Sequence, residues 1–208
     1  MTERLAVVTG AARGIGAAVA RRLACDGWSL LLLDACAPQP AADYPMPGPE
    51  DLAAVARECT AAGAKSVGTL VADVGDGSVR GMLRDLLAGR VPSAVVTAAG
   101  VIRGDAAWAI PDDAFELTLR VNLFGVRHLA DACVPAMIEA GAGRFVAVSS
   151  AAALRAMPQP PRRPRQTGRP RPRSWPARTR RLGAGRRTGS PAGLAQRRRR
   201  VSPRPRLP

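Results

Sequence analysis

The sequence has almost no tyrosine or lysine. Among its 208 residues it has a single tyrosine, Tyr44, and a single lysine, Lys65, and aromatic residues make up only 3% of the chain. The four cysteines are widely spaced, without a CxxC pair or clustered histidines, which argues against a zinc site or a disulfide framework. The longest aliphatic run, LLLL at 30–33, is too short to span a bilayer, and no basic leader precedes it. We therefore expect a cytoplasmic protein with reduced thiols and no membrane segment.

Acidic residues are missing from the last quarter of the chain. All 16 of them lie within residues 1–157, together with 14 basic ones, whereas residues 158–208 contain 17 arginines, 11 prolines and no acid. The net charge of +15 therefore comes from this tail. The tail has too few apolar residues to offset the entropy of ordering, and its prolines disfavour both helix and sheet. We expect one domain at 1–157 followed by a disordered, Arg/Pro-rich tail at 158–208.

Apolar runs alternate with helix-like periodicity over residues 1–150. Continuously apolar strands belong in a sheet that is covered on both faces, and short links with helical crossovers make that sheet parallel. The sequence therefore predicts an α/β fold with a doubly wound parallel sheet that ends after a fifth strand. The predicted strands are 5–9, 28–34, 66–73, 93–100 and 144–150, and the predicted helices are one that stops at Gly27 and those at 50–62, 78–89 and 111–140.

The turn between the first predicted strand and helix reads TGAARGIG. Gly10 allows a tight exit from the strand, Gly14 lets the backbone approach a pyrophosphate, and Gly16 permits close helix packing. The helix N-terminus adds N–H donors and a positive dipole end. The alternative is a glycine turn of structural value only. We predict a dinucleotide site made by Thr9, Gly10, Arg13, Gly14, Ile15 and Gly16.

Asp34 ends the second predicted strand, 18 residues after Gly16. A carboxylate at this place accepts hydrogen bonds from both ribose hydroxyls and repels a 2′-phosphate. With Ala35 beside it, the site favours NAD over NADP. Arg13 is the one residue nearby that could shift this balance.

With these motifs in order, residues 4–159 resemble the short-chain dehydrogenase/reductase family, which has a Rossmann fold. TGAARGIG is similar to the family's cofactor loop, and Asp34 to its ribose acid. Ala98 departs from the pattern, because the family has an asparagine there. The remaining positions that the resemblance assigns are Asp73 and Val74 at the adenine edge, Ala98, Ala99 and Gly100 at the end of the central strand, and Asn122 and Ser150 in the active site.

The resemblance implies an oxidoreductase that transfers hydride between a nicotinamide and a small-molecule alcohol or carbonyl substrate. In the family a tyrosine is the general acid/base and a lysine four residues later lowers its pKa. At the family's spacing from Ser150, these positions hold Arg163 and Thr167. A guanidinium stays protonated near neutral pH and cannot replace the tyrosine. We therefore expect the enzyme to be inactive as written.

The stretch DACAPQPAADYPMPGPEDLAAVA, at 34–56, resembles a mycofactocin-dependent subgroup that has a longer loop after the ribose acid. This resemblance implies a tightly held NAD and the peptide-derived carrier mycofactocin as electron acceptor. Members of the family form homo-oligomers through a helix that this chain lacks, so we expect that interface to be lost. Without the segment that follows in the family, RFVAVSS becomes an uncovered edge, which predicts marginal folding or aggregation.

Two hypotheses address the tail. Its arginine, proline, glycine and alanine are typical of a GC-rich gene read in a shifted frame after Gln159. The rival hypothesis is a non-catalytic, NAD-binding remnant whose tail binds nucleic acid or acidic surfaces nonspecifically, because 17 arginines attract phosphates with strong salt dependence.

Overall fold

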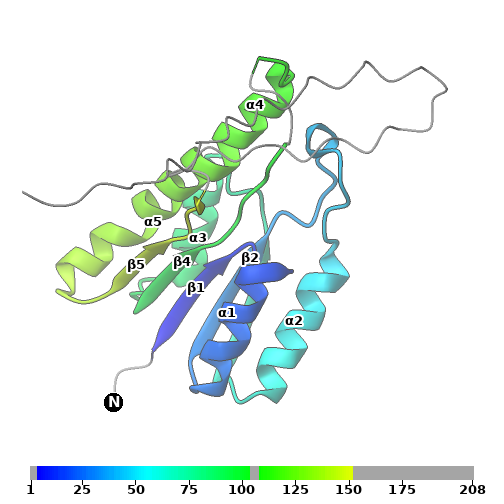
Figure 1. Ribbon diagram of the computed structural model, residues 1–208. Helices are drawn as coiled ribbons and strands as arrows, with labels where there is room; N and C mark the ends of the chain where they lie inside the picture. The colour runs from blue at the N-terminus through cyan, green and yellow to red at the C-terminus, as the bar shows by residue number, and fades with distance from the viewer. Residues whose placement is uncertain (1–3, 104–107, 152–208) are drawn as a thin grey trace, which may run out of the picture. The chain divides into compact units, whose positions relative to one another are not determined.

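A five-stranded parallel sheet forms the centre of the protein in a computed structural model that describes residues 4–103 and 108–151 (Figure 1). The strand order β3-β2-β1-β4-β5 places β1 in the middle, where it pairs with β2 and β4. The direction of winding reverses between β1 and β4, and ligands of such sheets bind at this point. The predicted doubly wound fold is confirmed, whereas the predicted tail at 158–208 lies outside the described residues. The strands are β1 (Leu5–Thr9), β2 (Ser29–Asp34), β3 (Ser66–Val71), β4 (Ala94–Thr97) and β5 (Arg144–Ala147).

Two groups of helices cover opposite faces of the sheet (Figure 1). Side chains alternate along β1, so that Ala6 and Val8 pack with the first group while Leu5 and Val7 pack with the second. Each face therefore has its own core cluster. The first group is α1 (Gly14–Cys25) and α2 (Pro49–Ala61), and the second is α3 (Val79–Leu87), α4 (Asp112–Leu119) and α5 (Gly125–Glu139).

The helix predicted at 111–140 is divided in the structure. A π-helical turn, η2 (Arg120–Phe124), joins α4 to α5 and contains Asn122. The helical run is continuous over the predicted range, but apolar periodicity is too coarse to reveal a turn that holds one additional residue. Such turns are frequent at functional sites.

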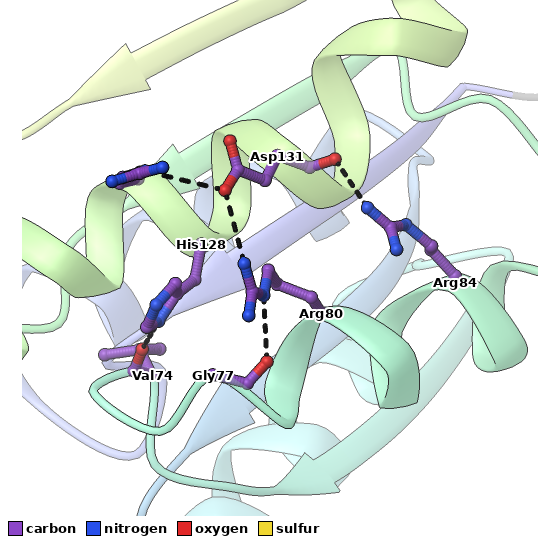
Figure 2. Close-up of polar contacts among 7 residues, drawn as sticks. Val74, Gly77, Arg80, Arg84, His128 and Asp131 are labelled. Atoms are coloured by element: carbon purple, nitrogen blue, oxygen red, sulfur yellow. Dashed lines mark hydrogen bonds and ion pairs between the residues drawn. The ribbon is translucent and has the colours of Figure 1, made fainter.

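Pro135 lies inside α5 and has no N–H to donate to the carbonyl oxygen of Asp131, four residues earlier. Arg84 of α3 supplies the missing donor, since its Nη2 lies 3.1 Å from that oxygen (Figure 2). One turn earlier in α5, the Nδ1 of His128 lies 2.9 Å from the carbonyl oxygen of Val74. These contacts attach α5 to α3 and to the loop after β3.

The inner and outer strands differ in burial. Every residue of β1 and β2 is buried, as the prediction of a sheet covered on both faces requires. In contrast, β3 and β5 are mostly exposed, because each is an edge of the described sheet. The prediction of an uncovered edge at RFVAVSS agrees with Val146 of β5, whose side chain is 48% exposed. Within the described residues, no helix combines the length and apolar character needed to cross a membrane.

Candidate functional site

The glycine loop between β1 and α1 is packed too closely for larger residues. A Cβ atom at Gly10 would lie 2.7 Å from the backbone of Ala99, and Gly10 also has a φ of 65°. A Cβ atom at Gly16 would lie 2.6 Å from the carbonyl carbon of Gly10. Gly14 has no such neighbour, but its φ of 56° favours glycine. The three predicted glycines are therefore required by local structure.

The N-terminus of α1 lies at the end of this loop, where the helix begins at Gly14. Arg13 is the cap residue, with extended backbone, and its side chain makes no capping hydrogen bond. The first turn contains no acidic residue either. The backbone N–H groups of Gly14, Ile15 and Gly16 therefore have neither a side-chain cap nor a competing carboxylate, which suits binding of a pyrophosphate.

Asp34 is buried at the end of β2, with 8% exposure, and backbone amides fix its orientation. Its Oδ2 accepts from the N–H of Ala12 at 3.1 Å, and its Oδ1 accepts from the N–H of Cys36 at 3.3 Å. Each carboxylate oxygen can accept a second hydrogen bond. The carboxylate is thus held with one lone pair on each oxygen left for a diol such as a ribose.

A cavity of about 220 Å³ lies at the carboxyl ends of β1, β2 and β4. It brings together most of the predicted cofactor residues, which come from four separate parts of the sequence. Thr9 and Gly16 do not line it and act through the packing of the loop. The predicted residues that line it are Gly10, Arg13, Gly14, Ile15, Asp34, Asp73, Val74, Ala98, Ala99 and Gly100.

Thr9, at the end of β1, connects this strand to the segment after β4, and the winding of the sheet reverses between these two strands. Its side chain is almost fully buried, and its Oγ1 accepts from the N–H of Ala99 at 3.2 Å. This hydrogen bond connects the end of β1 to the segment after β4. The residue before Ala99 is Ala98, which has no side-chain amide for such a role. The hydroxyl of Thr9 therefore helps to hold the floor of the cavity.

Asp73 and Val74 form the side of the cavity that follows β3. Asp73 Oδ1 accepts from the N–H of Gly75 at 2.8 Å, and Oδ2 lies 3.4 Å from Nη2 of Arg120 in the π-helical turn. Val74 is buried, and its carbonyl oxygen is held by His128. Both predicted residues are thus fixed by contacts to the α4–η2–α5 segment.

Asn122 forms a two-way pair with the backbone of Val101. Its Oδ1 accepts from the N–H of Val101 at 2.9 Å, and its Nδ2 donates to the carbonyl oxygen of Val101 at 2.8 Å. The side chain therefore holds the loop after β4 as a neighbouring strand would. Ser150 lies beyond the end of β5 and is exposed. Arg163 and Thr167, at the positions of the family's tyrosine and lysine, lie outside the described residues.

Residues 36–48, which we name the strap, cross from the glycine loop to the loop after β4. Arg13 Nη1 donates to the carbonyl oxygen of Pro45 at 2.8 Å, and its guanidinium lies 5.6 Å from the centre of the Tyr44 ring. On the other side, the Tyr44 hydroxyl accepts from the N–H of Ile102 at 3.1 Å. Arg103 Nη1 donates to the carbonyl oxygen of Ala41 at 2.9 Å. Sequence reasoning missed these long-range contacts.

The cysteines do not form a nucleophilic or metal site. Burial, followed by the charges of Asp34 and Asp51, raises the pKa of Cys36 to about 11. Burial also raises the pKa of Cys133 to about 11 and that of Cys59 above its ordinary value. Cys25 is exposed, and none of the four forms a disulfide. In the part of the chain that the structure describes, no group of histidines, cysteines and carboxylates could hold a metal ion.

Comparison with known proteins identifies this arrangement. The sequence model of the family described as short chain dehydrogenase matches residues 4–161. The chain belongs to this family. Its curated relatives include an uncharacterized NAD-dependent oxidoreductase of Mycobacterium tuberculosis, which is 40% identical over 159 residues, or 74% of this chain and 58% of the relative. The chain thus spans little more than half the length of such relatives.

Solved structures share the fold and carry a nucleotide. A carveol dehydrogenase from Mycobacterium avium in complex with NAD is 31% identical, with a TM-score of 0.70 over 74% of this chain and 57% of its own. A metagenomic short-chain oxidoreductase in complex with NADP is 32% identical, with a TM-score of 0.62 over 72% of this chain and 62% of its own. Together with the named relative, the first of these supports NAD as the nucleotide of the cavity.

Proposed function

We propose that this chain is the cofactor-binding part of an oxidoreductase and prefers NAD to NADP. Asp34 carries the proposal, because its buried carboxylate lies in the same cavity as the glycine loop and is held by the amides of Ala12 and Cys36. A 2′-phosphate would bring a second negative charge against this carboxylate. Arg13 does not offset the repulsion, since its guanidinium is bound to Pro45 and Met46 of the strap.

The residues present suit the binding of the whole dinucleotide. Asp34 would hold the adenosine ribose, Asp73 and Val74 the adenine edge, and the amides of Gly14, Ile15 and Gly16 the pyrophosphate. Asn122 would keep the loop after β4 beside the nicotinamide end through its pair with Val101. When bound, a nicotinamide supplies hydride transfer to or from an alcohol or carbonyl carbon.

The chain as written lacks the proton-transfer group that this chemistry needs. Tyr44 and Lys65 are its only tyrosine and lysine. Tyr44 belongs to the strap, where its hydroxyl accepts from Ile102, and Lys65 lies just before β3. We therefore propose binding without turnover, with Ser150 and Asn122 in place but without the acid/base that they assist. General acid/base groups contribute about 10²–10⁴-fold in rate.

Titration calorimetry with NAD and NADP tests the binding, and absorbance at the reduced nicotinamide band tests turnover. We expect NAD to bind at least about tenfold more tightly than NADP, which corresponds to about 1.4 kcal/mol. Alcohols of the class named by the carveol dehydrogenase neighbours should give no reduction above the rate without enzyme. Equal affinity for the two nucleotides would refute the preference, and turnover would refute the missing-acid argument.

The strap supports a finer proposal, that NAD is held tightly in this chain; in a chain that carried the tyrosine and lysine, such a NAD would be reoxidised in place by a second electron acceptor such as mycofactocin. Arg13 binds one side of the strap and Tyr44 binds Ile102 on the other side, so the strap connects the glycine loop to the loop after β4. The Arg13→Gln variant should release NAD about tenfold faster in a stopped-flow chase with excess unlabelled nucleotide. The Arg57→Gln variant, which changes an exposed arginine on α2, is the matched control. Equal release rates in the two variants would rule out this role of the strap.

A separate proposal concerns residues 158–208, whose 17 arginines and lack of acid favour nonspecific binding to nucleic acid or acidic surfaces. Duplex DNA binding should weaken steeply with salt, because the protein releases counterions from the phosphates. A chain with the same tail composition in scrambled order should bind equally well. Weaker binding by the scrambled chain would indicate a specific, sequence-dependent recognition instead.

A further inference from the structure

A shallow groove of about 500 Å³ lies between α3 and α5, lined by residues that do not line the cofactor cavity. Arg80 and Arg84 extend from α3 toward Asp131 on α5 (Figure 2). Gly81 leaves space beside them, since a Cβ atom there would meet no atom within 4 Å. The groove is therefore open to solvent and bordered by charged side chains.

Positive charge exceeds negative charge in this groove. Arg80 and Arg84 are four residues apart on one helix, where like charges face and repel each other. Arg127 approaches the same carboxylate from α5, with its Nε 3.7 Å from Asp131 Oδ2. Two guanidinium groups, those of Arg80 and of Arg127 beside the groove, thus share one carboxylate, while Arg84 contacts only the backbone carbonyl oxygen of Asp131. Three positive charges therefore face one negative charge, which leaves two without a counter-ion among these side chains.

Asp131 holds these arginines only loosely. Its Oδ2 lies 3.6 Å from Nη1 of Arg80 and 3.7 Å from Nε of Arg127, which is longer than a charge-assisted hydrogen bond. By comparison, Nε of Arg21 lies 2.5 Å from Oε2 of Glu58 on the opposite face of the sheet. The carboxylate of Asp131 therefore satisfies neither Arg80 nor Arg127, and both side chains keep N–H donors for another anion.

The third arginine is already oriented by the fold. Arg84 Nη2 donates to the carbonyl oxygen that Pro135 leaves without its helical donor, and this bond fixes the guanidinium at the groove. Arg80 is oriented in a similar way, because its Nε donates to the carbonyl oxygen of Gly77 at 3.0 Å. Two planar groups held by backbone oxygens lose little further freedom when they bind a ligand.

We propose that this groove binds a phosphate dianion, free or as the ester of a small molecule. Guanidinium groups match phosphate oxygens in pairs, and a dianion supplies the two negative charges that the groove lacks. The opening at Gly81 leaves room for the carbon part of an ester. Asp131 competes with the ligand for Arg80 and Arg127, so the carboxylate weakens the site that it lines.

Chemical shifts of the Gly77 and Gly81 amides in the full-length, ¹⁵N-labelled chain report on this groove alone. Inorganic phosphate should shift both amides with saturation, and sodium chloride at equal ionic strength should not. Methyl phosphate should bind comparably, because the groove is open; binding of inorganic phosphate alone would identify free phosphate as the ligand. The arginines of residues 158–208 contribute equally in all variants, so differences between variants isolate the groove.

Two substitutions give opposite expected effects. Arg127→Gln should weaken phosphate binding about fivefold, as expected for one exposed charge contact, and Asp131→Asn should tighten it about fivefold because the competing carboxylate is removed. Arg57→Gln, the matched loss of one exposed charge on α2, should change nothing. Circular dichroism confirms the fold of each variant; Arg127 is 71% exposed, so its substitution is tolerated. Unchanged affinity in Asp131→Asn, or equal shifts with chloride, would overturn the proposal.

Discussion

In the sheet, only β4 lies between β1 and β5, yet the two strands differ strongly in burial. Every residue of β1 is buried between helices on both faces, whereas β5 has three exposed residues out of four. The half that contains β1, β2, α1 and α2 therefore completes its own core. The half that contains Asn122 and Ser150 leaves apolar side chains exposed, among them Phe115, Leu123, Phe124, Ile138 and Val146. The proposed nucleotide site thus takes its glycine loop and Asp34 from the better packed part of the molecule.

The largest expected effect comes from a substitution in the glycine loop, where the well-packed half is most tightly packed. Gly16→Ala places a Cβ atom against the backbone of Gly10, so the loop must shift. We expect a loss of about 3 kcal/mol in the free energy of unfolding and loss of NAD binding. Gly81→Ala in α3 is the control, because its Cβ meets no atom and alanine favours helix by about 1 kcal/mol. Urea unfolding measures both; similar destabilisation of the two variants would contradict the packing described.

Trimming one valine in each half compares them directly. Val8→Ala removes two methyl groups from a fully buried site on β1 that packs with α1 and α2, and should cost about 2–3 kcal/mol in the free energy of unfolding. Val146→Ala on β5 removes the same atoms from a side chain that is 48% exposed, and should cost about 0.5 kcal/mol or less. Equal costs in urea unfolding would show that β5 is covered in solution.

Asp34→Asn tests whether the well-packed half selects the nucleotide. The amide keeps the shape of the side chain but removes its negative charge, so NAD should bind about tenfold more weakly while NADP gains relative to NAD. Asp51→Asn, in the first turn of α2, removes a carboxylate that lies outside the cavity and is the control. Calorimetry that shows the same ratio of affinities for wild type and Asp34→Asn would exclude this carboxylate as the selector.

The smallest expected effect is a difference in thiol labelling. Cys59 of α2 and Cys133 of α5 are both buried, and burial raises the pKa of both, so labelling requires local opening. We expect Cys133 to react a few-fold faster than Cys59 with iodoacetamide, and exposed Cys25 to react first. Because the thiolate reacts and opening returns the thiol of Cys133 to an ordinary pKa of about 8.5, its rate should rise close to tenfold from pH 7 to 8 and less steeply above that. Mass spectrometry follows each site, and faster labelling of Cys59 would reverse the ranking of the two halves.

The features that could be predicted from the sequence are those that depend on neighbouring residues. The glycine loop and Asp34 were predictable because each depends on local chemistry: a left-handed φ at Gly10 and Gly14, a buried carboxylate at the end of a strand. The five strands followed from short apolar runs. These features are encoded within a few residues, so a single sequence reveals them.

Other features depend on residues far apart and were not predictable. The contacts of Arg13 with Tyr44 and Pro45, and of Tyr44 with Ile102, join three separate loops. Sequence reasoning considered Arg13 as a cofactor-binding residue that could admit NADP, whereas the structure also attaches it to the strap. The exposure of β3 was also missed, because SVGTLV has the composition of a buried strand but lies at an edge.

The π-helical turn at Arg120–Phe124 makes the position of Asn122 depend on the number of residues in the turn. A π-helical turn is equivalent to one residue inserted into a regular helix, and an α-helix advances about 100° per residue. Deleting one residue of this turn would join α4 and α5 into a single regular helix and rotate one of them by about that angle relative to the other. Leu117 and Leu129, now buried on the same side of the sheet, would then no longer face it together. The turn thus keeps two helices in phase with one core while it directs an amide toward Val101.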